Sequence, residues 1–166
     1  ALWTCRSHAI ADALSFDMGG TTAKLCVIRD GVAERSRRFE AGRMHRFVAG
    51  SGLPVAVPVY DLVEIGAGGG SIARVDTLGL LAVGPDSSGA EPGPACYGRG
   101  GSAPTVTDAD LVLGLIDAAC FLGGAMPLDA GAAHAAIERA VATPLGFDVA
   151  AAAHGIHDLV NETMAS

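Results

Sequence analysis

The sequence predicts an α/β fold in which antiparallel β-hairpins come first and alanine-rich helices follow. In residues 1–83, short apolar runs alternate with glycine-rich turns, the pattern of strands and hairpins. In residues 107–166, apolar side chains recur at helical spacing and alanine is frequent. Residues 84–106 are rich in proline and glycine and predict a loop between these regions. We therefore expect one partial domain, residues 1–166, in three parts.

The composition is that of a soluble acidic protein with its own core. Half of the 166 residues are apolar, 17% are charged and the formal net charge is −7, which argues against a disordered tail. An acidic chain is also a poor partner for nucleic acid. Its basic residues cluster without aromatic residues to stack on bases, so we expect a solvated face there. The cluster comprises Arg35, Arg37, Arg38, Arg43 and Arg46.

Neither a membrane span nor a metal-binding cysteine pattern is visible. No apolar run reaches the length of about 18 residues that a span needs, and no signal-peptide pattern is present. The scattered cysteines lack the paired spacing of a zinc site. They are Cys5, Cys26, Cys96 and Cys120. We expect reduced thiols in a cytoplasmic protein.

The stretch Ser15–Lys24, SFDMGGTTAK, carries the strongest chemical signal. Because glycine lacks a Cβ, the backbone N–H groups of Gly19–Thr22 can approach an anion closely. The hydroxyls of Thr21 and Thr22 add donors, and Asp17 could orient a hydrated Mg²⁺. The stretch therefore predicts a phosphate-binding turn. A tight β-hairpin without a ligand stays open as the alternative, since Gly-Gly is also a hairpin signal.

Strands are expected on both sides of this turn. The tail of a short helix lies within Leu2–Ala13, and Asp30-Gly31 predicts a second hairpin turn. Glu40–Gly52 is polar, basic and bounded by glycine, which indicates a surface loop. The three expected antiparallel strands are Ala13–Phe16, Leu25–Arg29 and Val32–Phe39.

The next segment predicts an edge strand and another hairpin. Pro54–Val63 alternates apolar residues, and Pro58 makes it an edge strand or a bulge. It leads into a glycine run, Gly66–Ser71, after which Ile72–Asp76 and Leu80–Val83 predict a hairpin. The loop that follows is long for a compact domain, which is typical of functional loops.

Three helices are expected in the last third of the chain. Each has a capping or opening signal: Thr107 and Asp108 for the first, Asp129 for the second and Asp148 for the third. The helices are Ala109–Ile116, Leu128–Ala142 and Val149–Met164.

Several other side chains are candidates for chemistry. Asp61, at a strand end beside the glycine run, could bind a metal or position water, with an ordinary turn residue as the alternative. Cys96 would act as a nucleophile only if a nearby cation such as Arg99 favoured its thiolate. His154 and His157 are more typical of solvent-edge histidines than of a metal pair.

The familiar nucleotide fingerprints do not match. The glycine run has Ser71 where the dinucleotide pattern G-x-G-x-x-G needs its third glycine. No P-loop and no G-x-S-x-G elbow occurs. A Rossmann site, a P-loop nucleotide site and a serine hydrolase of that type are therefore disfavoured.

Four motifs in order resemble the hydantoinase A / 5-oxoprolinase family, which includes N-methylhydantoinases and acetone carboxylase subunits. They are SFDMGGTTAK, PVYDLVEIGAGGGSIARVD, VGPDSSGAEPGPACYGRGGSAPTVTDADLVLG and FLGGAMPLD. That family is similar in fold to the actin, Hsp70 and sugar-kinase ATPases, a ribonuclease H-like fold. The resemblance implies that this chain is a central fragment, one segment of such an ATPase half.

The resemblance also implies site residues. Asp17 would hold Mg²⁺ and act in catalysis, and Asp61 would be a second catalytic carboxylate. Many members have an acidic residue where this chain has Lys24, which could meet a phosphate directly. The implied ATP-binding residues are Gly19, Gly20, Thr21, Thr22, Lys24, Gly66, Gly68, Gly69, Gly70 and Ser71.

The activity implied is ATP-dependent hydrolysis of a cyclic amide, opening a hydantoin or 5-oxoproline ring together with a hydantoinase B-type partner subunit or domain. One alternative is an ATP-dependent carboxylase subunit of the acetone carboxylase type. Another is a non-catalytic module that requires a partner. Substrate tests with acetone against hydantoin would separate the two enzymes.

Overall fold

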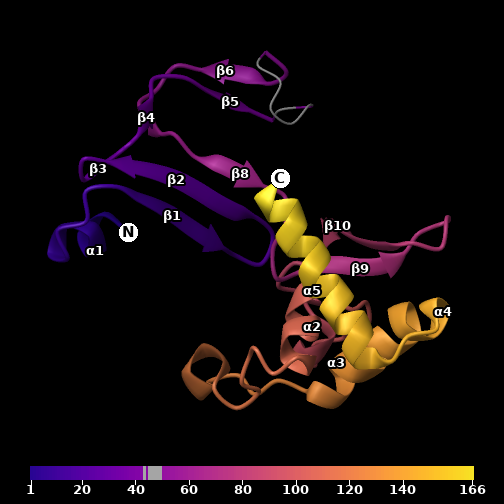
Figure 1. The fold of residues 1–166 in the computed structure, drawn as a ribbon. Coiled ribbons are helices and arrows are strands. Elements are labelled where there is room, and N and C mark those ends of the chain that lie inside the picture. Colours follow the sequence, from indigo (N-terminus) through magenta and orange to yellow (C-terminus); the bar gives the residue numbers. More distant parts are fainter. Residues whose placement is uncertain (43, 45–49) are drawn as a thin grey trace. The chain divides into compact units, whose positions relative to one another are not determined.

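The computed structural model describes residues 1–42, 44 and 50–166. These residues divide into two compact units, Ala1–Asp17 with Lys24–Glu64 and Met18–Ala23 with Ile65–Ser166. Figure 1 shows the elements in chain order. After one short N-terminal helix, antiparallel hairpins precede the remaining helices, which confirms the predicted α/β class. The single partial domain stays a prediction.

The first unit combines a short helix, α1 (Leu2–Ser7), with a small sheet in which β1, β2 and β3 lie in this order and β8 also pairs with β2. Strands β1 and β2 run in opposite directions (Figure 1). Asp30 and Gly31 join β2 to β3 with φ of 50° and 70°, the backbone expected of a two-residue hairpin turn. Cys5 and Ile28 lie in the unit's small core. The strands are β1 (Ala13–Met18), β2 (Ala23–Arg29), β3 (Val32–Ala33) and β8 (Val63–Ile65).

The expected continuous strand Val32–Phe39 is wrong, because the chain changes partners after β3. Strand β4 pairs with β7, and β5 pairs with β6. Pro58, which has no N–H to donate, lies between β6 and β7 and divides the expected strand Pro54–Val63 as well. The four short strands are β4 (Arg35–Ser36), β5 (Phe39–Ala41), β6 (Leu53–Val55) and β7 (Val59–Tyr60).

The expected surface loop Glu40–Gly52 begins inside β5. The Glu40 carboxylate accepts hydrogen bonds from the N–H groups of Gly50 at 2.7 Å and Gly52 at 3.3 Å. Residues 43 and 45–49 of this loop lie outside the described residues. Two members of the predicted basic cluster, Arg43 and Arg46, are therefore outside them too.

The second unit packs helices around a β-hairpin. Strands β9 (Ser71–Val75) and β10 (Leu81–Ser87) pair antiparallel, which confirms the predicted hairpin. In its turn the Asp76 carboxylate accepts from the N–H groups of Leu78 and Leu80. Its helical elements are η1 (Ala95–Tyr97), α2 (Val106–Val112), η2 (Phe121–Gly124), α3 (Ala130–Ile137), the π-helical turn η3 (Glu138–Ala142), α4 (Thr143–Leu145) and α5 (Val149–Ala165).

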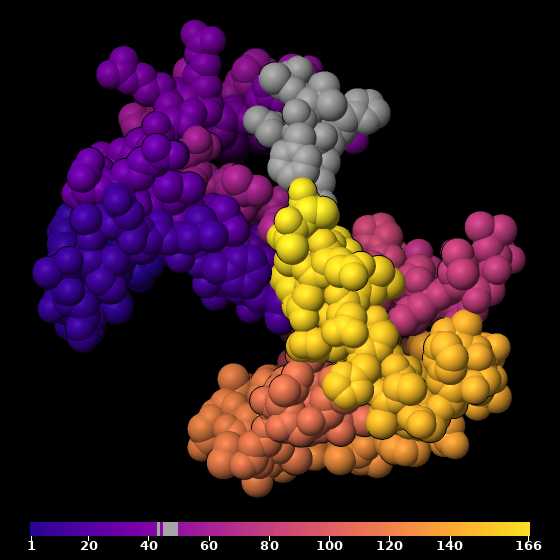
Figure 2. Space-filling view, viewed as in Figure 1, coloured from indigo at the N-terminus to yellow at the C-terminus, as the bar shows by residue number. Residues whose placement is uncertain are grey.

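Helix α5 supplies much of the apolar core of this unit. It packs against α2, α3, η3 and β10, and Figure 2 shows it in yellow against the orange segment that includes α3 and η3. Ile156 and Val160 of α5 are buried with Ile137 and Val141. None of the described helices is both long and apolar enough to span a membrane.

Two of the predicted helix caps are confirmed and one is wrong. Asp129 caps α3 and Asp148 caps α5, each accepting an N–H from the first turn. In α2, however, the N-cap is Thr105, not Thr107 or Asp108. The Thr105 side chain and the Asp108 carboxylate form a reciprocal capping box, so the helix starts earlier than expected.

Candidate functional site

The glycine turn, residues Gly19–Thr22, joins β1 to β2 as a tight hairpin. The N–H of Gly19 donates to the carbonyl oxygen of Thr22 at 3.0 Å, which closes the hairpin. The choice between a phosphate-binding turn and a hairpin without a ligand stays a prediction. Gly20 and Thr21 at its tip are exposed. Within the part of the chain that the structure describes, their backbone N–H groups donate to no protein acceptor. Two adjacent amides thus remain for an anion.

The glycine run packs directly against the glycine turn. The N–H of Gly69 donates to the Gly19 carbonyl oxygen at 2.9 Å, and the N–H of Gly70 donates to the Gly20 carbonyl oxygen at 2.6 Å. A Cβ built at Gly68 would stand 2.6 Å from the Gly19 carbonyl oxygen. Glycine is needed at Gly68 because two backbones touch there. The structure thereby brings together two predicted site segments that are distant in sequence.

Four amides of the glycine run, those of Gly68–Ser71, are satisfied inside the protein. The N–H of Gly68 donates to the Ser71 hydroxyl, and the N–H of Ser71 donates to the Gly68 carbonyl oxygen, both at 3.0 Å. Since the N–H groups of Gly69 and Gly70 bind the glycine turn, the run offers a phosphate none of these four donors. Gly66 is exposed, and a Cβ there would meet no atom within 4 Å. The predicted binding role of these residues stays a prediction.

The carbonyl groups of the run are held by two residues that the sequence did not mark as site residues. Thr107, at the start of α2, donates to the Gly69 carbonyl oxygen from its N–H at 2.8 Å and from its Oγ1 at 2.9 Å. Ser88 donates to the Gly70 carbonyl oxygen from its N–H at 2.8 Å and its Oγ at 3.3 Å. Their hydroxyls gave no local signal of a contact this distant in sequence.

Asp108 fixes the start of α2 from a fully buried position. Its carboxylate accepts from the N–H and the hydroxyl of Thr105, both at 2.9 Å. It also accepts from the N–H groups of Ala95 at 3.2 Å and Cys96 at 2.7 Å, in the proline- and glycine-rich loop. The charge is therefore matched by four donors, which ties this loop to the helix that carries Thr107.

The other predicted site residues lie in the first unit. Asp17 is exposed on β1. Lys24 on β2 forms an ion pair with Glu64, with Nζ and Oε1 3.3 Å apart. Asp61 is exposed, and its N–H donates to the Glu34 carbonyl oxygen. Their roles in catalysis and binding stay predictions.

No ready-made metal site is visible in the described part of the chain, which holds no group of three or more His, Cys, Asp or Glu residues suited to a metal ion. His157 instead contacts the Asp110 carboxylate at 2.9 Å between α5 and α2, while His154 is exposed. His154 thus lies at the solvent edge as expected, whereas His157 is half-buried against α2.

Cys96 is not an accessible nucleophile. Its side chain is fully buried. Burial raises the pKa of the Cys96 thiol far above its usual range, and the negative Asp108 carboxylate raises it further. The catalytic alternative for Cys96 is therefore wrong, because the loop turns the thiol inward instead of holding it at the surface.

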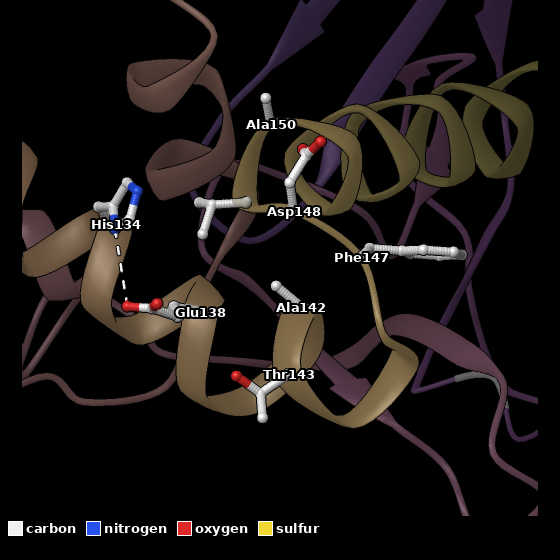
Figure 3. A pocket seen from close by; sticks show the side chains of 8 residues that line it. His134, Glu138, Ala142, Thr143, Phe147, Asp148 and Ala150 are labelled. Atoms are coloured by element: carbon white, nitrogen blue, oxygen red, sulfur yellow. Dashed lines mark ion pairs between the residues drawn. The ribbon is translucent and has the colours of Figure 1, made fainter.

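A shallow hollow of about 470 Å³ lies beside the start of α5 (Figure 3). His134 and Glu138 form an ion pair at 3.9 Å on one side, and Asp148 caps α5 on the other. Two carboxylates here disfavour a phosphate, and none of the predicted site residues contributes. The lining residues are His134, Glu138, Ala142, Thr143, Phe147, Asp148, Val149 and Ala150.

A glycine turn with free amides, held against a second glycine segment, occurs here in a chain that belongs to the hydantoinase/oxoprolinase family: the family model matches residues 4–166. The predicted family is thereby confirmed. Among its relatives, the chain is 41% identical over 165 residues to caprolactamase subunit alpha of Pseudomonas jessenii. This match covers 99% of the chain and 22% of the relative.

Two solved structures share the fold. The crystal structure of the ATP-dependent caprolactamase from Pseudomonas jessenii superposes with a TM-score of 0.77 at 40% identity, over 98% of this chain and 22% of that one. The nucleotide-free structure of acetone carboxylase, an enzyme of ATP-dependent acetone carboxylation, gives a TM-score of 0.80 at 28% identity, over 97% and 22%. The chain thus spans about a fifth of these proteins.

Proposed function

We propose that the protein to which this chain belongs hydrolyses a cyclic amide in an ATP-dependent reaction, and that the chain supplies a turn that binds phosphate. The observation that carries this proposal is the pair of unengaged amides at Gly20 and Thr21, on a turn braced by the glycine run. The similarity to an ATP-dependent caprolactamase, named for a cyclic amide, supports the same activity.

The residues fit a triphosphate better than a neutral ligand. The amides of Gly20 and Thr21 point from an exposed turn without a side chain at position 20, so a phosphate oxygen can approach closely. The hydroxyls of Thr21 and Thr22 would add donors. ATP, when bound, would supply the phosphoryl group that activates the ring amide oxygen. Positioning and charge neutralisation by this chain would support that chemistry.

We propose roles for three charged residues of the first unit as well. Asp17 would hold Mg²⁺, which needs few protein carboxylates because it keeps several of its waters. Lys24 would exchange its ion pair with Glu64 for a phosphate oxygen. Asp61 would act as a second carboxylate near the ring, which we propose is a hydantoin, 5-oxoproline or related lactam.

We further propose a partner subunit or domain of the hydantoinase B type and a cytoplasmic location. The relative in Pseudomonas jessenii is itself named as a subunit, which supports a partner. The acetone carboxylase likeness, with its TM-score of 0.80, favours a second candidate, an ATP-dependent carboxylase subunit. A non-catalytic module completed by a partner is the remaining alternative for the 166 residues by themselves.

The test is ADP formation by the full-length protein with its partner, measured with hydantoin, 5-oxoproline, caprolactam or acetone. We expect a cyclic amide to stimulate ADP release and to be opened with it, whereas stimulation by acetone with carboxylation would favour the second candidate. In Asp17→Asn, loss of the metal-facing charge should lower kcat by about a hundredfold or more. Ring opening at the wild-type rate in this variant would refute the assignment of Asp17.

A further inference from the structure

The orientation of the glycine turn depends on hydrogen bonds from outside residues 19–22. A backbone hydrogen bond from Gly19 to Thr22 closes it, and Gly20 has no side chain to restrict the backbone. What fixes its carbonyl groups is the pair of donors from Gly69 and Gly70 in the glycine run. The orientation of the turn therefore depends on how rigidly the run itself is held.

The glycine run also has few side chains to hold its backbone, so it too depends on hydrogen bonds from neighbouring segments. Support comes from the opposite side of the peptide group that carries the Gly70 N–H: its Gly69 carbonyl oxygen accepts from both the N–H and the Oγ1 of Thr107, at 2.8 and 2.9 Å. The fit is close, because a Cβ at Gly69 would stand 2.7 Å from the Thr107 hydroxyl. Thr107 thus contacts the residue that donates to Gly19.

Thr107 itself is rigid. It is buried, it lies in the first turn of α2, and its neighbour Asp108 accepts four hydrogen bonds from Thr105, Ala95 and Cys96. A β-branched side chain on a helix has few rotamers, so its hydroxyl is aimed at Gly69 with little loss of entropy. A continuous hydrogen-bonded path runs from this buried carboxylate region through Thr107 and Gly69 to the glycine turn.

Resting on the proposed function, we propose that Thr107 is a positioning residue for ATP phosphate. It acts through Gly69 and sets where the amides of Gly20 and Thr21 point, without touching the nucleotide itself. The proposal concerns the Thr107 hydroxyl, because the backbone N–H of residue 107 donates to Gly69 whatever side chain stands there.

Three variants of the full-length protein with its partner separate this role from general stability. Thr107→Val removes the hydroxyl and keeps the shape, whereas Thr107→Ser keeps the hydroxyl. Thr163→Val is the matched control, because the Thr163 hydroxyl also donates to a backbone carbonyl oxygen, that of Leu159 in α5, at 2.8 Å. Each variant is measured by amide hydrogen exchange of the peptide covering residues 18–23 without ATP, and by the KM for ATP and kcat.

Within residues 18–23, the hydrogen-bonded Gly19 amide reports how firmly the turn is held. We expect this amide to exchange several-fold faster in Thr107→Val. The KM for ATP should rise about fivefold, with kcat at saturating ATP changed less than twofold. Thr107→Ser should restore both values, and Thr163→Val should leave both at the wild-type level. Wild-type exchange in Thr107→Val, or equally fast exchange in Thr163→Val, would overturn the proposal. Exchange needs no ATP. A wild-type protein without ATP-dependent activity would refute the proposed function, and exchange would still decide whether the Thr107 hydroxyl holds the glycine turn.

Discussion

The buried side chains of Asp108 and Cys96 in the second unit stabilise the fold instead of reacting with a ligand. The Asp108 side chain has 0% exposure, and the four hydrogen bonds that it accepts come from three residues. Cys96 lies next to it with its thiol turned inward. The prolines and glycines that flank Cys96 fold the loop over the Asp108 carboxylate, which accepts from the N–H groups of Ala95 and Cys96.

The cysteines therefore differ in reactivity. A brief treatment of the native protein with iodoacetamide at pH 8.5 should modify exposed Cys120 and leave Cys96 intact until urea is added, as mass spectrometry of the peptides would show. Hydrogen bonding to Asp117 raises the pKa of Cys120, which slows its reaction but does not block access. Modification of Cys96 as fast as Cys120 would contradict the buried loop.

The same thiol should affect stability at high pH. The folded state raises the pKa of Cys96, so the unfolded chain loses this proton first, above about pH 8.5. The stabilising contribution of the protonated thiol is thus fully present below that pH and is lost as the pH rises.

At the level of elements, the sequence predicted what local signals determine. The β9–β10 hairpin and the caps of α3 and α5 follow from turn residues and Asp N-caps, and all are confirmed. The α2 cap was missed although Thr105 and Asp108 have the spacing of a capping box. The division of Val32–Phe39 depends on partners in later strands, so no local pattern could show it.

In the candidate site, too, local sequence patterns predict the turn but not its distant contacts. The glycine turn was found from its composition, whereas its bracing by Gly69, Gly70 and Thr107 links segments distant in sequence. A glycine-rich pattern predicts that two backbones approach closely, but it does not show which segment is the partner. Contacts between segments distant in sequence become visible only in the folded structure.

The contact between the glycine run and the glycine turn leaves no room for a side chain at Gly68. In Gly68→Ala the new methyl would meet the Gly19 carbonyl oxygen at 2.6 Å and the Gly20 carbonyl carbon at 2.8 Å. We expect the free energy of unfolding to fall by about 1–3 kcal/mol, because backbone must move. Urea unfolding of this variant beside Gly20→Ala checks it, since a Cβ at Gly20 meets nothing within 4 Å. Equal stability of the two variants would contradict the close packing.

At the scale of the whole molecule, the chain corresponds to one segment of its longer relatives. The chain matches about a fifth of the length of caprolactamase subunit alpha. Its second unit contains the glycine turn, the run and Thr107 together. The central claim is that the tip of this turn binds the phosphates of ATP.

Calorimetric titration of ATP into the full-length protein tests that claim most directly, with wild type, Gly20→Ala and Thr77→Ala compared. The Gly20 methyl would stand in open space at the turn tip, where a phosphate must approach, whereas Thr77 lies in the exposed β9–β10 turn. The account predicts at least tenfold weaker binding in Gly20→Ala, about 1.4 kcal/mol, with an unchanged unfolding midpoint and wild-type affinity in Thr77→Ala. Wild-type affinity in Gly20→Ala would contradict it.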